Sequence, residues 1–407
     1  MKKPKIRFKG YQEDWEQRKL VDLVDRVTRK NQDLVSELPL TISAQYGLID
    51  QNEFFDKRVA SKDVSGYYLI ENGEFAYNKS TSTDAPWGAI KRLDRYKNGV
   101  LSTLYIVFGI KENNPVDSDF LVSYYSTNLW HKGIHEIAAE GARNHGLLNI
   151  APADFFETKL MIPQDIEEQK KIGKYFEELE RLITLHQRKC EETKTLKKYM
   201  LQKMFPQNGH SVPEIRFSGF TEDWEQRKFA DFTWDAGKRN KEDLDLEPYA
   251  ITNEHGFIRQ RDAHDDFGYM KDTDRKAYNI VQPNSFAYNP ARINVGSIGY
   301  YKGVENVIVS SLYEVFQTDN YVNDRFLWHW LKSDEFPRWI AKLQEGSVRL
   351  YFYYDKLCEC QLYMPSLEEQ EKIATFLDDL DHLITLHQHK CEELQNIKKF
   401  MLKNMFI

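Results

Sequence analysis

Two stretches of the chain, residues 165–205 and 366–406, place apolar side chains at intervals of three and four residues. Charged residues fill most positions between them, and this pattern is typical of a coiled-coil helix with an a/d seam. Each stretch therefore predicts a long amphipathic helix, and each offers the other a partner within the chain. The predicted seam consists of Ile172, Phe176, Leu179, Ile183, His186 and Cys190 in the first helix, and Ile373, Leu377, Leu380, Ile384, His387 and Cys391 in the second.

Both predicted helices begin with a helix-start signal. Asp165 with Glu168, and Ser366 with Glu369, occupy the N-cap and N3 positions of a capping box. At a rise of about 1.5 Å per residue, a helix of roughly forty residues forms a rod about 60 Å long.

The repeat extends beyond the helices. The sequence Glu-Asp-Trp-Glu-Gln-Arg-Lys occurs at 13–19 and at 222–228, and Phe-Ala-Tyr-Asn occurs at 75–78 and at 286–289. A repeat of about 200 residues is too long for a solenoid unit, so we infer two homologous domains in tandem. The predicted segments are a first domain at 1–162, a helical segment at 163–209, a second domain at 210–364 and a second helical segment at 365–407.

The middles of the two halves diverge and mix strand and helix signals. Residues 103–110 and 306–316 are rich in β-branched and aromatic side chains, which favours strands. Residues 120–130 and 326–331 are apolar and predict short helices. We therefore expect an α+β fold class in which each domain is an α/β unit of ordinary size.

Composition is that of a globular protein, with 41% hydrophobic and 29% charged residues. No run approaches the roughly 18 apolar residues of a membrane span, and the basic start is not followed by the apolar stretch of a signal peptide. The four cysteines form no disulfide framework, so we expect a cytoplasmic protein. The net charge of −7 counts against a small electrostatic nucleic-acid binder. A large acidic protein can still carry one basic groove or share a partner's charge.

Motifs of the common catalytic sites are absent. The chain has neither a GxxxxGK[ST] phosphate loop nor a Gly-x-Ser-x-Gly elbow. The run 289–292, Asn-Pro-Ala-Arg, superficially resembles the Asn-Pro-Pro-aromatic motif of amino-methyltransferases. It lacks the second proline and the aromatic residue that stacks a flipped base. We therefore expect no enzymatic activity and no cofactor bound by this chain.

A histidine and a cysteine recur four residues apart in both predicted helices, at 186/190 and 387/391. In a folded-back pair these four side chains could converge as a zinc site. The CxxC-type loops that usually accompany structural zinc are missing, so the interpretation as seam residues is favoured and no metal is expected.

Basic residues in predicted loops, with aromatic neighbours, are the candidates for contacts to DNA, because arginine and asparagine bind guanine and adenine edges. For any one of them alone, a solvated surface charge is the favoured interpretation. Arg143 and Arg349 are favoured because both follow a Glu-Gly in a loop just before the predicted strand that leads into the long helix. The candidates are Lys91, Arg92, Arg95, Arg143, Asn144 and His145 in the first half, and Arg259, Arg261, Arg275, Lys276, Arg292, Arg349 and Tyr351 in the second.

Together these features resemble the specificity subunit of type I restriction–modification systems, a bacterial family. The repeated Glu-Asp-Trp-Glu-Gln-Arg-Lys, the Glu-Glu-Gln that begins each long helix and Gly-Ala-Arg-Asn-His at 141–145 carry the resemblance, which covers the whole chain. The second half departs from the last of these motifs, reading Gly-Ser-Val-Arg-Leu at 346–350.

The resemblance implies two target-recognition domains, each reading one half of a bipartite, asymmetric site in double-stranded DNA. The helices would pair as an antiparallel intramolecular coiled coil, set the unread spacer between the half-sites and dock two methyltransferase subunits. S-adenosylmethionine would belong to the methyltransferase, and ATP and Mg²⁺ to the restriction subunits of the full complex.

A coiled-coil scaffold whose two domains bind proteins is the alternative. A steep loss of DNA affinity with rising salt would distinguish the DNA-binding interpretation from the scaffold.

Overall fold

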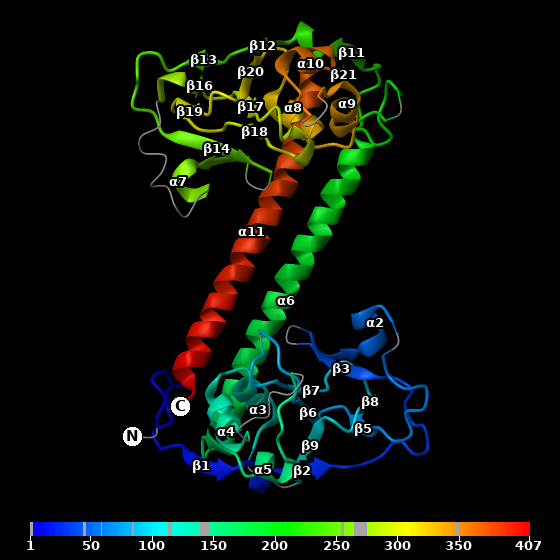
Figure 1. The fold of residues 1–407 in the computed structure, drawn as a ribbon, viewed down its shortest axis with the longest axis vertical. Helices are drawn as coiled ribbons and strands as arrows, with labels where there is room; N and C mark the ends of the chain where they lie inside the picture. Colours follow the sequence, from blue (N-terminus) through cyan, green and yellow to red (C-terminus); the bar gives the residue numbers. More distant parts are fainter. Residues whose placement is uncertain are drawn as a thin grey trace. The chain divides into compact units, whose positions relative to one another are not determined.

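The computed structural model divides into two compact units. Unit 1 comprises Met1–Gln187 and His389–Ile407, and unit 2 comprises Arg188–Gln388, so each unit combines one half of the chain with part of the other half's long helix. Figure 1 shows the elements coloured along the sequence. The structure describes residues 3–43, 46–57, 59–83, 85–112, 116–138, 146–207, 209–253, 256–263, 275–346 and 350–407.

Unit 1 is built on a four-stranded antiparallel sheet of order β2–β9–β6–β7, accompanied by the pairs β1–β10, β3–β4 and β5–β8 (Figure 1). Its strands are β1 (Glu16–Lys19), β2 (Val24–Val27), β3 (Leu40–Ser43), β4 (Gly47–Asp50), β5 (Tyr68–Glu71), β6 (Phe75–Asn78), β7 (Ala89–Arg92), β8 (Asn98–Leu101), β9 (Ile106–Ile110) and β10 (Lys159–Ile162). Its short helices are α1 (Leu20–Leu23), α2 (Gln51–Phe55), α3 (Ser118–Tyr125), α4 (Leu129–Ile137) and α5 (Pro152–Phe156).

Unit 2 has the corresponding sheet, of order β12–β20–β17–β18, and a five-stranded sheet of order β13–β16–β19–β14–β15 beside the pair β11–β21. Its strands are β11 (Glu225–Lys228), β12 (Thr233–Asp235), β13 (Lys238–Arg239), β14 (Pro248–Thr252), β15 (Gly256–Arg259), β16 (Asn279–Val281), β17 (Phe286–Tyr288), β18 (Ile298–Tyr300), β19 (Val307–Val309), β20 (Glu314–Thr318) and β21 (Gln361–Met364). Its helices are α7 (Gln260–Ala263), α8 (Asp324–Leu331), α9 (Glu335–Leu343) and α10 (Tyr354–Glu359), with 3₁₀ turns η1 (Phe229–Asp231), η3 (Arg275–Ala277) and η4 (Ile293–Val295).

The mixed helix and sheet content confirms the predicted α+β class, but two predicted elements are each divided. The strand predicted at 306–316 is two strands, because a turn in which the Tyr313 amide donates to the Ser310 carbonyl at 3.0 Å separates β19 from β20. The helix predicted at 120–130 ends at Tyr125 and restarts at Leu129. Thr127 separates the two helices, since its hydroxyl accepts from the Leu129 amide at 3.2 Å.

Each half ends in a single long helix, α6 (Ile166–Lys203, 38 residues) and α11 (Leu367–Met405, 39 residues). Within unit 2, Cys190 lies against the Ile384 carbonyl while Lys197 binds Asp381 at 2.6 Å. From the first contact to the second, the residue number rises in α6 and falls in α11, so the helices pair antiparallel there. None of the described helices combines the length and the apolar character that crossing a membrane requires.

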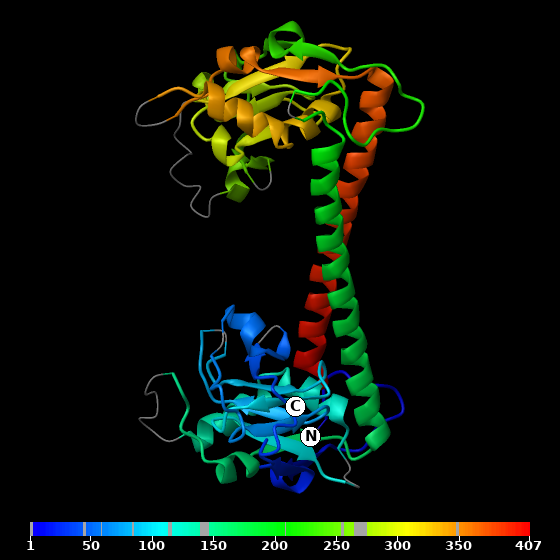
Figure 2. The ribbon, with the colours of Figure 1, turned by 90° about the vertical axis from the view of Figure 1, so that its right-hand side faces the viewer.

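The antiparallel pairing is also present within unit 1. The rings of Phe176 and Phe406 are 5.8 Å apart, and Glu180 pairs with Lys398. Figures 1 and 2 show the last turns of α11 beside α6 in this unit. Lys197–Asp381 and Lys398–Glu180 are equivalent pairs of the repeat, so the same contact forms in both units.

Most of the predicted seam is buried. The buried residues are Ile172, Phe176, Leu179, Ile183 and Cys190 in α6, and Ile373, Leu377 and Leu380 in α11. The other four seam positions, His186, Ile384, His387 and Cys391, are half-buried.

Each unit completes its core with the end of the long helix from the other half. Phe406 packs its ring against Trp15 and Phe120 in unit 1, at 6.1 and 5.4 Å. In unit 2, Phe205 takes the same place against Trp224 and Phe326. The domain cores and the helix pairs are therefore continuous within each unit.

A buried ion pair ties the N-terminal segment of each half to the start of its long helix. Arg7 donates from Nε and Nη2 to the two oxygens of Glu168, at 2.6 and 2.8 Å. Arg216 makes the same two-pronged contact with Glu369, at 2.7 and 2.8 Å. The hydrogen bond with Glu168 raises the pKa of Arg7, although burial opposes the shift.

This arrangement corrects the predicted capping boxes, which are only half formed. Asp165 accepts from the Glu167 amide at 2.8 Å, and Ser366 accepts from the Glu369 amide at 3.4 Å. A complete capping box would also have the glutamate side chain accept from the backbone amide of the N-cap residue. Glu168 and Glu369 instead bind the arginine of the N-terminal segment of their own half.

The glutamine that follows each of these glutamates adds a second tie. Gln169 accepts from the Asp117 amide at the start of α3 and donates to the Pro163 carbonyl, both at 2.8 Å. Gln370 makes the equivalent pair of contacts in unit 2. The Glu-Gln dipeptide therefore joins each long helix to the domain that precedes it.

Substituting Gly173 with alanine should destabilise unit 1 by about 1–3 kcal/mol, because α6 passes α3 too closely for a side chain. A Cβ at this position would lie 2.6 Å from the Asp119 Cβ and 2.8 Å from the Phe120 amide nitrogen. Urea unfolding measures the change. The matched control is Gly133→Ala in α4, where a Cβ would meet Thr158 at 3.5 Å and should stabilise the helix. Equal stabilisation by both variants would refute the tight α6–α3 contact.

Candidate nucleic-acid interface

Three of the predicted basic residues lie around the segment that leads into β14 of unit 2. Arg261 in α7 pairs with Glu247 at 3.7 Å, and Lys276 in η3 pairs with Asp243 at 3.7 Å, beside Arg275. Exposed pairs of this length contribute only about 0–1 kcal/mol. These cations can therefore exchange their carboxylate partners for phosphate groups at little cost.

Arg259 ends β15 at the same side of the five-stranded sheet. Its Nε lies 3.5 Å from the hydroxyl oxygen of Tyr249, whose ring packs against Phe257 and Tyr301 at 6.3 and 5.9 Å. This aromatic cluster positions an exposed guanidinium next to the cations of α7 and η3.

Arg292 and Tyr351 belong to a second surface of unit 2. The Phe352 amide donates to the Pro290 carbonyl at 3.1 Å, which joins the segment of Tyr351 to the turn that carries Arg292. The rings of Tyr351 and Tyr353 are stacked with centroids 5.5 Å apart, and Tyr353 is 49% exposed. The structure thus joins the turn of the exposed Arg292 to a segment with two stacked tyrosines, of which Tyr353 is exposed and Tyr351 half-buried.

Four of the predicted contacts, Arg143, Asn144, His145 and Arg349, lie outside the described residues. The chain on the C-terminal side of the first three is anchored, because the Gly146 carbonyl accepts from the amide and hydroxyl of Thr81 at 2.7 and 3.1 Å. The corresponding bond in unit 2 joins the Phe352 amide to the Pro290 carbonyl. In both units the bond is made by a residue shortly after the Phe-Ala-Tyr-Asn strand.

The first-half candidates differ from one another in environment. Lys91 in β7 is half-buried; burial lowers the pKa of this lysine, repulsion from Lys398 adds to the shift, and Glu180 partly offsets it. Lys91 therefore lies near the ion pair that Glu180 of α6 forms with Lys398 of α11 in unit 1.

Arg92 is already occupied by carboxylates. It binds Asp94 at 2.6 Å and Asp119 at 2.7 Å, and these neighbours raise the pKa of its guanidinium although burial alone would lower it.

Arg95, like the neighbouring Lys97, is an exposed cation of this region. It lies in a turn held on both sides by Asn72, whose side-chain amide donates to the Asp94 and Tyr96 carbonyls at 3.2 and 3.0 Å. Arg95 is thus the first-half candidate best placed to contact a ligand.

The repeated asparagine of Phe-Ala-Tyr-Asn has a structural role that the sequence patterns did not reveal. Asn78 accepts from the Ser80 amide and Asn289 from the Ala291 amide, both at 3.0 Å. Each asparagine therefore shapes the turn after its strand, at Asn78 and at Asn289 alike.

An exposed apolar face on the long helices was also missed. Repeat-equivalent positions expose apolar side chains in both helices, in steps of three residues. The clearest pairs are Leu196 with Ile397, exposed by 43% and 36%, and Tyr199 with Phe400, exposed by 50% and 57%. The sequence did contain a signal for this face, because these apolar residues recur at a helical interval outside the predicted seam.

Among the described residues, one group of three side chains has the composition of a metal site: His329, Asp378 and Asp381. Asp378 is bound by Arg325 at 2.9 Å, and Asp381 by Lys197 at 2.6 Å. Burial lowers the pKa of His329, whose Nε2 lies 2.9 Å from Asp378. Both carboxylates are already paired with cations, so this group is an ion-pair network between α8 and the two long helices.

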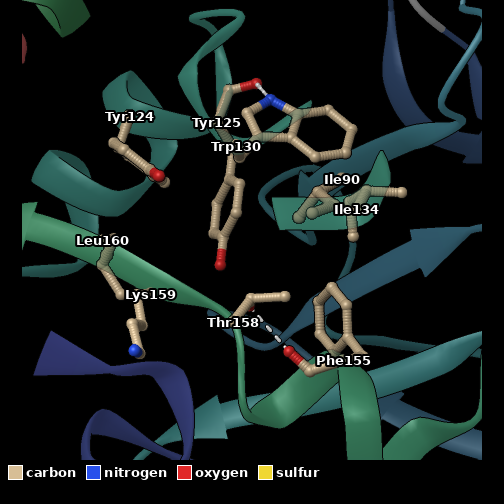
Figure 3. Close-up of a pocket in the computed structure, with 9 residues that line it drawn as sticks. All are labelled: Ile90, Tyr124, Tyr125, Trp130, Ile134, Phe155, Thr158, Lys159 and Leu160. Carbon is tan, nitrogen blue, oxygen red and sulfur yellow. Dashed lines mark hydrogen bonds between the residues drawn. The ribbon is translucent and has the colours of Figure 1, made fainter. Parts of the chain in front are cut away.

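The small pocket of Figure 3 lies in the core of unit 1 and is lined mainly by apolar and aromatic side chains. The Trp130 indole donates to the Tyr125 carbonyl at 3.1 Å, and the Thr158 hydroxyl donates to the Phe155 carbonyl at 2.7 Å (Figure 3). These polar groups are already engaged by backbone, so the pocket belongs to core packing.

The chain is similar to known proteins along nearly its whole length. It is 22% identical over 411 residues to the specificity subunit of the type I restriction enzyme MjaVIII of Methanocaldococcus jannaschii, covering 95% of this chain and 91% of that protein. The crystal structure of a type I restriction–modification S subunit from M. genitalium has a TM-score of 0.62 at 14% identity, covering 100% of this chain and 99% of that one. This structural likeness confirms the fold.

The family described as type I restriction modification DNA specificity domain matches twice, at residues 12–195 and 221–396. Each match contains one divergent domain and most of the long helix that follows it, as the duplication predicts. The two matches together account for most of the chain, so the resemblance found in its sequence is confirmed: this protein belongs to the type I restriction modification DNA specificity family.

Proposed function

We propose that this chain is the DNA sequence-specificity subunit of a type I restriction–modification complex in the cytoplasm. The observation that carries the proposal is the tandem match, in which two divergent domains alternate with two helices that share identical blocks of sequence. The similar helices perform the same function in both halves, and the divergent domains recognise two different half-site sequences. The chain contributes recognition and leaves the chemistry to its partners.

Each domain reads one half of a bipartite, asymmetric site in double-stranded DNA. The cations around β14 and the Arg292–Tyr351 surface support this role in unit 2, and Arg95 supports it in unit 1. Weakly paired surface cations suit phosphate contacts, and arginine suits guanine edges.

The long helices dock two methyltransferase subunits and set the spacer between the half-sites. Leu196 with Tyr199, and Ile397 with Phe400, supply equivalent exposed apolar positions that suit two copies of one partner. S-adenosylmethionine then belongs to the methyltransferase, and ATP with Mg²⁺ to the restriction subunits that join the complex.

A protein-binding scaffold is the weaker interpretation, because the family match favours DNA specificity. Binding to genomic DNA in the presence of the methyltransferase should fall steeply with salt if phosphates are contacted. A flat salt response would favour the scaffold.

Alanine at Arg292 and alanine at Arg95 should each change the methylation of a different half-site. Loss of one base contact costs about 1–3 kcal/mol, so methylation should relax or weaken about 5- to 150-fold at one half-site and keep its preference at the other. Methylome sequencing of a host that expresses each variant with the methyltransferase measures this. Arg338→Ala, which removes the ion pair of an exposed arginine with the half-buried Glu335, is the control. Equal weakening of both half-sites by either variant would contradict the assignment of one half-site to each domain.

A further inference from the structure

The two copies of Glu-Asp-Trp-Glu-Gln-Arg-Lys are identical at positions where the fold does not need them to be. Only the tryptophan, Trp15 or Trp224, is buried in both copies. β11 exposes all four of its side chains, Glu225–Lys228, and yet they match β1 residue for residue. Exposed substitutions usually change stability by less than about 0.5 kcal/mol, so stability alone does not preserve such residues.

Buried positions next to these strands have diverged. Leu20 and Leu23 of the first half correspond to Phe229 and Phe232 of the second, and all four are at most 2% exposed. A duplication that drifted freely would show the reverse pattern, with surface residues changing first. The exposed identity therefore indicates a contact made by this face in both copies.

Contacts inside the protein do not account for the identity. Glu16 pairs with Arg18 at 3.1 Å and Glu225 pairs with Arg227, in each case two residues apart on one strand; the first pair is half-buried and the second is exposed. Pairs of this kind are worth about 0–1 kcal/mol. The side chains of Gln17 and Gln226 are exposed in both copies.

The backbone of these strands is also available. β1 pairs only with β10, and β11 only with β21, among the described residues. The second edge of each strand offers unpaired amides and carbonyls, the usual site for an added strand of another protein. Figure 1 shows β1 at the rim of unit 1.

We propose that the outer face of β1 and its copy β11 is a second docking site for the methyltransferase subunits, one copy on each strand. This inference rests on the proposed function, because it takes the two identical partners from it. The charge order, acidic from Glu13 to Glu16 and basic at Arg18 and Lys19, selects a segment with the opposite order. The Arg7–Glu168 pair ties the N-terminal segment that precedes β1 to the start of α6, so this segment is fixed against the long helix.

The proposal is tested by exchanging the charges of the Glu–Arg pair on each strand, which reverses the charge order of the face and keeps the ion pair within the strand. The variants are Glu16→Lys/Arg18→Glu in β1, Glu225→Lys/Arg227→Glu in β11, and both together. Native mass spectrometry of the full chain titrated with the methyltransferase subunit should show two copies bound to the unaltered protein. Reversal in β1 should weaken one copy at least tenfold and leave the other unchanged. Reversal in both strands should weaken both copies at least tenfold.

The control is Lys132→Glu/Glu136→Lys, which reverses an exposed pair in α4, where the halves differ. Its binding and unfolding temperature should equal those of the unaltered protein. Unchanged methyltransferase affinity in the doubly reversed chain overturns the proposal, as does a loss confined to restriction-subunit binding. Failure of the unaltered chain to bind methyltransferase overturns the proposed function itself, and the titration separates the two results.

Discussion

Replacing Arg7 with methionine should lower the free energy of unfolding of unit 1 by about 3–5 kcal/mol, because it leaves the Glu168 carboxylate buried without a partner. The Glu168 side chain is 1% exposed and the Arg7 side chain 13%, and their two hydrogen bonds measure 2.6 and 2.8 Å. Water cannot replace the lost guanidinium at that depth. Urea unfolding gives the total loss, and hydrogen exchange of peptides from 6–20 and 160–180 should place it in unit 1.

Two further variants separate the buried charge from the lost packing. Removing both partners, with Arg7→Met and Glu168→Met, should recover much of the loss, because no charge is then left buried. Arg18→Met removes a pair that is only half-buried and should cost no more than about 1 kcal/mol. A loss for Arg7→Met as small as that for Arg18→Met would disprove the role of the buried pair.

The long helices were the most predictable part of the fold. Their seam follows a seven-residue period that depends only on neighbouring residues, and Ile172 and Leu377 are buried as the period predicts. Repetition within the chain supplied the domain count. Patterns of this kind can be recognised in the sequence without any knowledge of long-range contacts.

Long-range pairing was not predictable in the same way. Glu168 looked like a capping-box residue, and only its distant partner Arg7 decides otherwise. Glu168 follows Arg7 by 161 positions, and the sequence between them carries no pattern that links the two. The repeat offered one unused clue, since Arg216 and Glu369 recur at equivalent places.

Candidate DNA contacts show the same limit. Lys91, Arg92 and Arg95 look alike as basic loop residues in the sequence. The structure separates them, because burial covers Lys91 and two aspartates occupy Arg92. Residue type indicates what a side chain can bind, whereas availability depends on neighbours that the fold supplies.

Lengthening both long helices by one heptad should abolish methylation of the native DNA site. We place the insertions after Gln187 and Gln388, which end the identical Leu-Ile-Thr-Leu-His-Gln of the two copies, so that the antiparallel register is kept on both sides. Seven residues add roughly 10 Å of helix, which matches about three base pairs of duplex. If the helices set the spacer, the recognised site should have a spacer longer by about three base pairs.

Three base pairs also turn the second half-site by roughly 100° around the duplex, so we expect the new site to be methylated more slowly than the native one. Methylome sequencing of a host that expresses the lengthened chain with the methyltransferase reads both sites at once. Gln187→Glu with Gln388→Glu changes the same junctions without adding length and should keep the native site. Native-spacer methylation that persists at full level in the lengthened chain would show that another part of the complex measures the DNA, because a helix that sets a distance cannot grow without changing it.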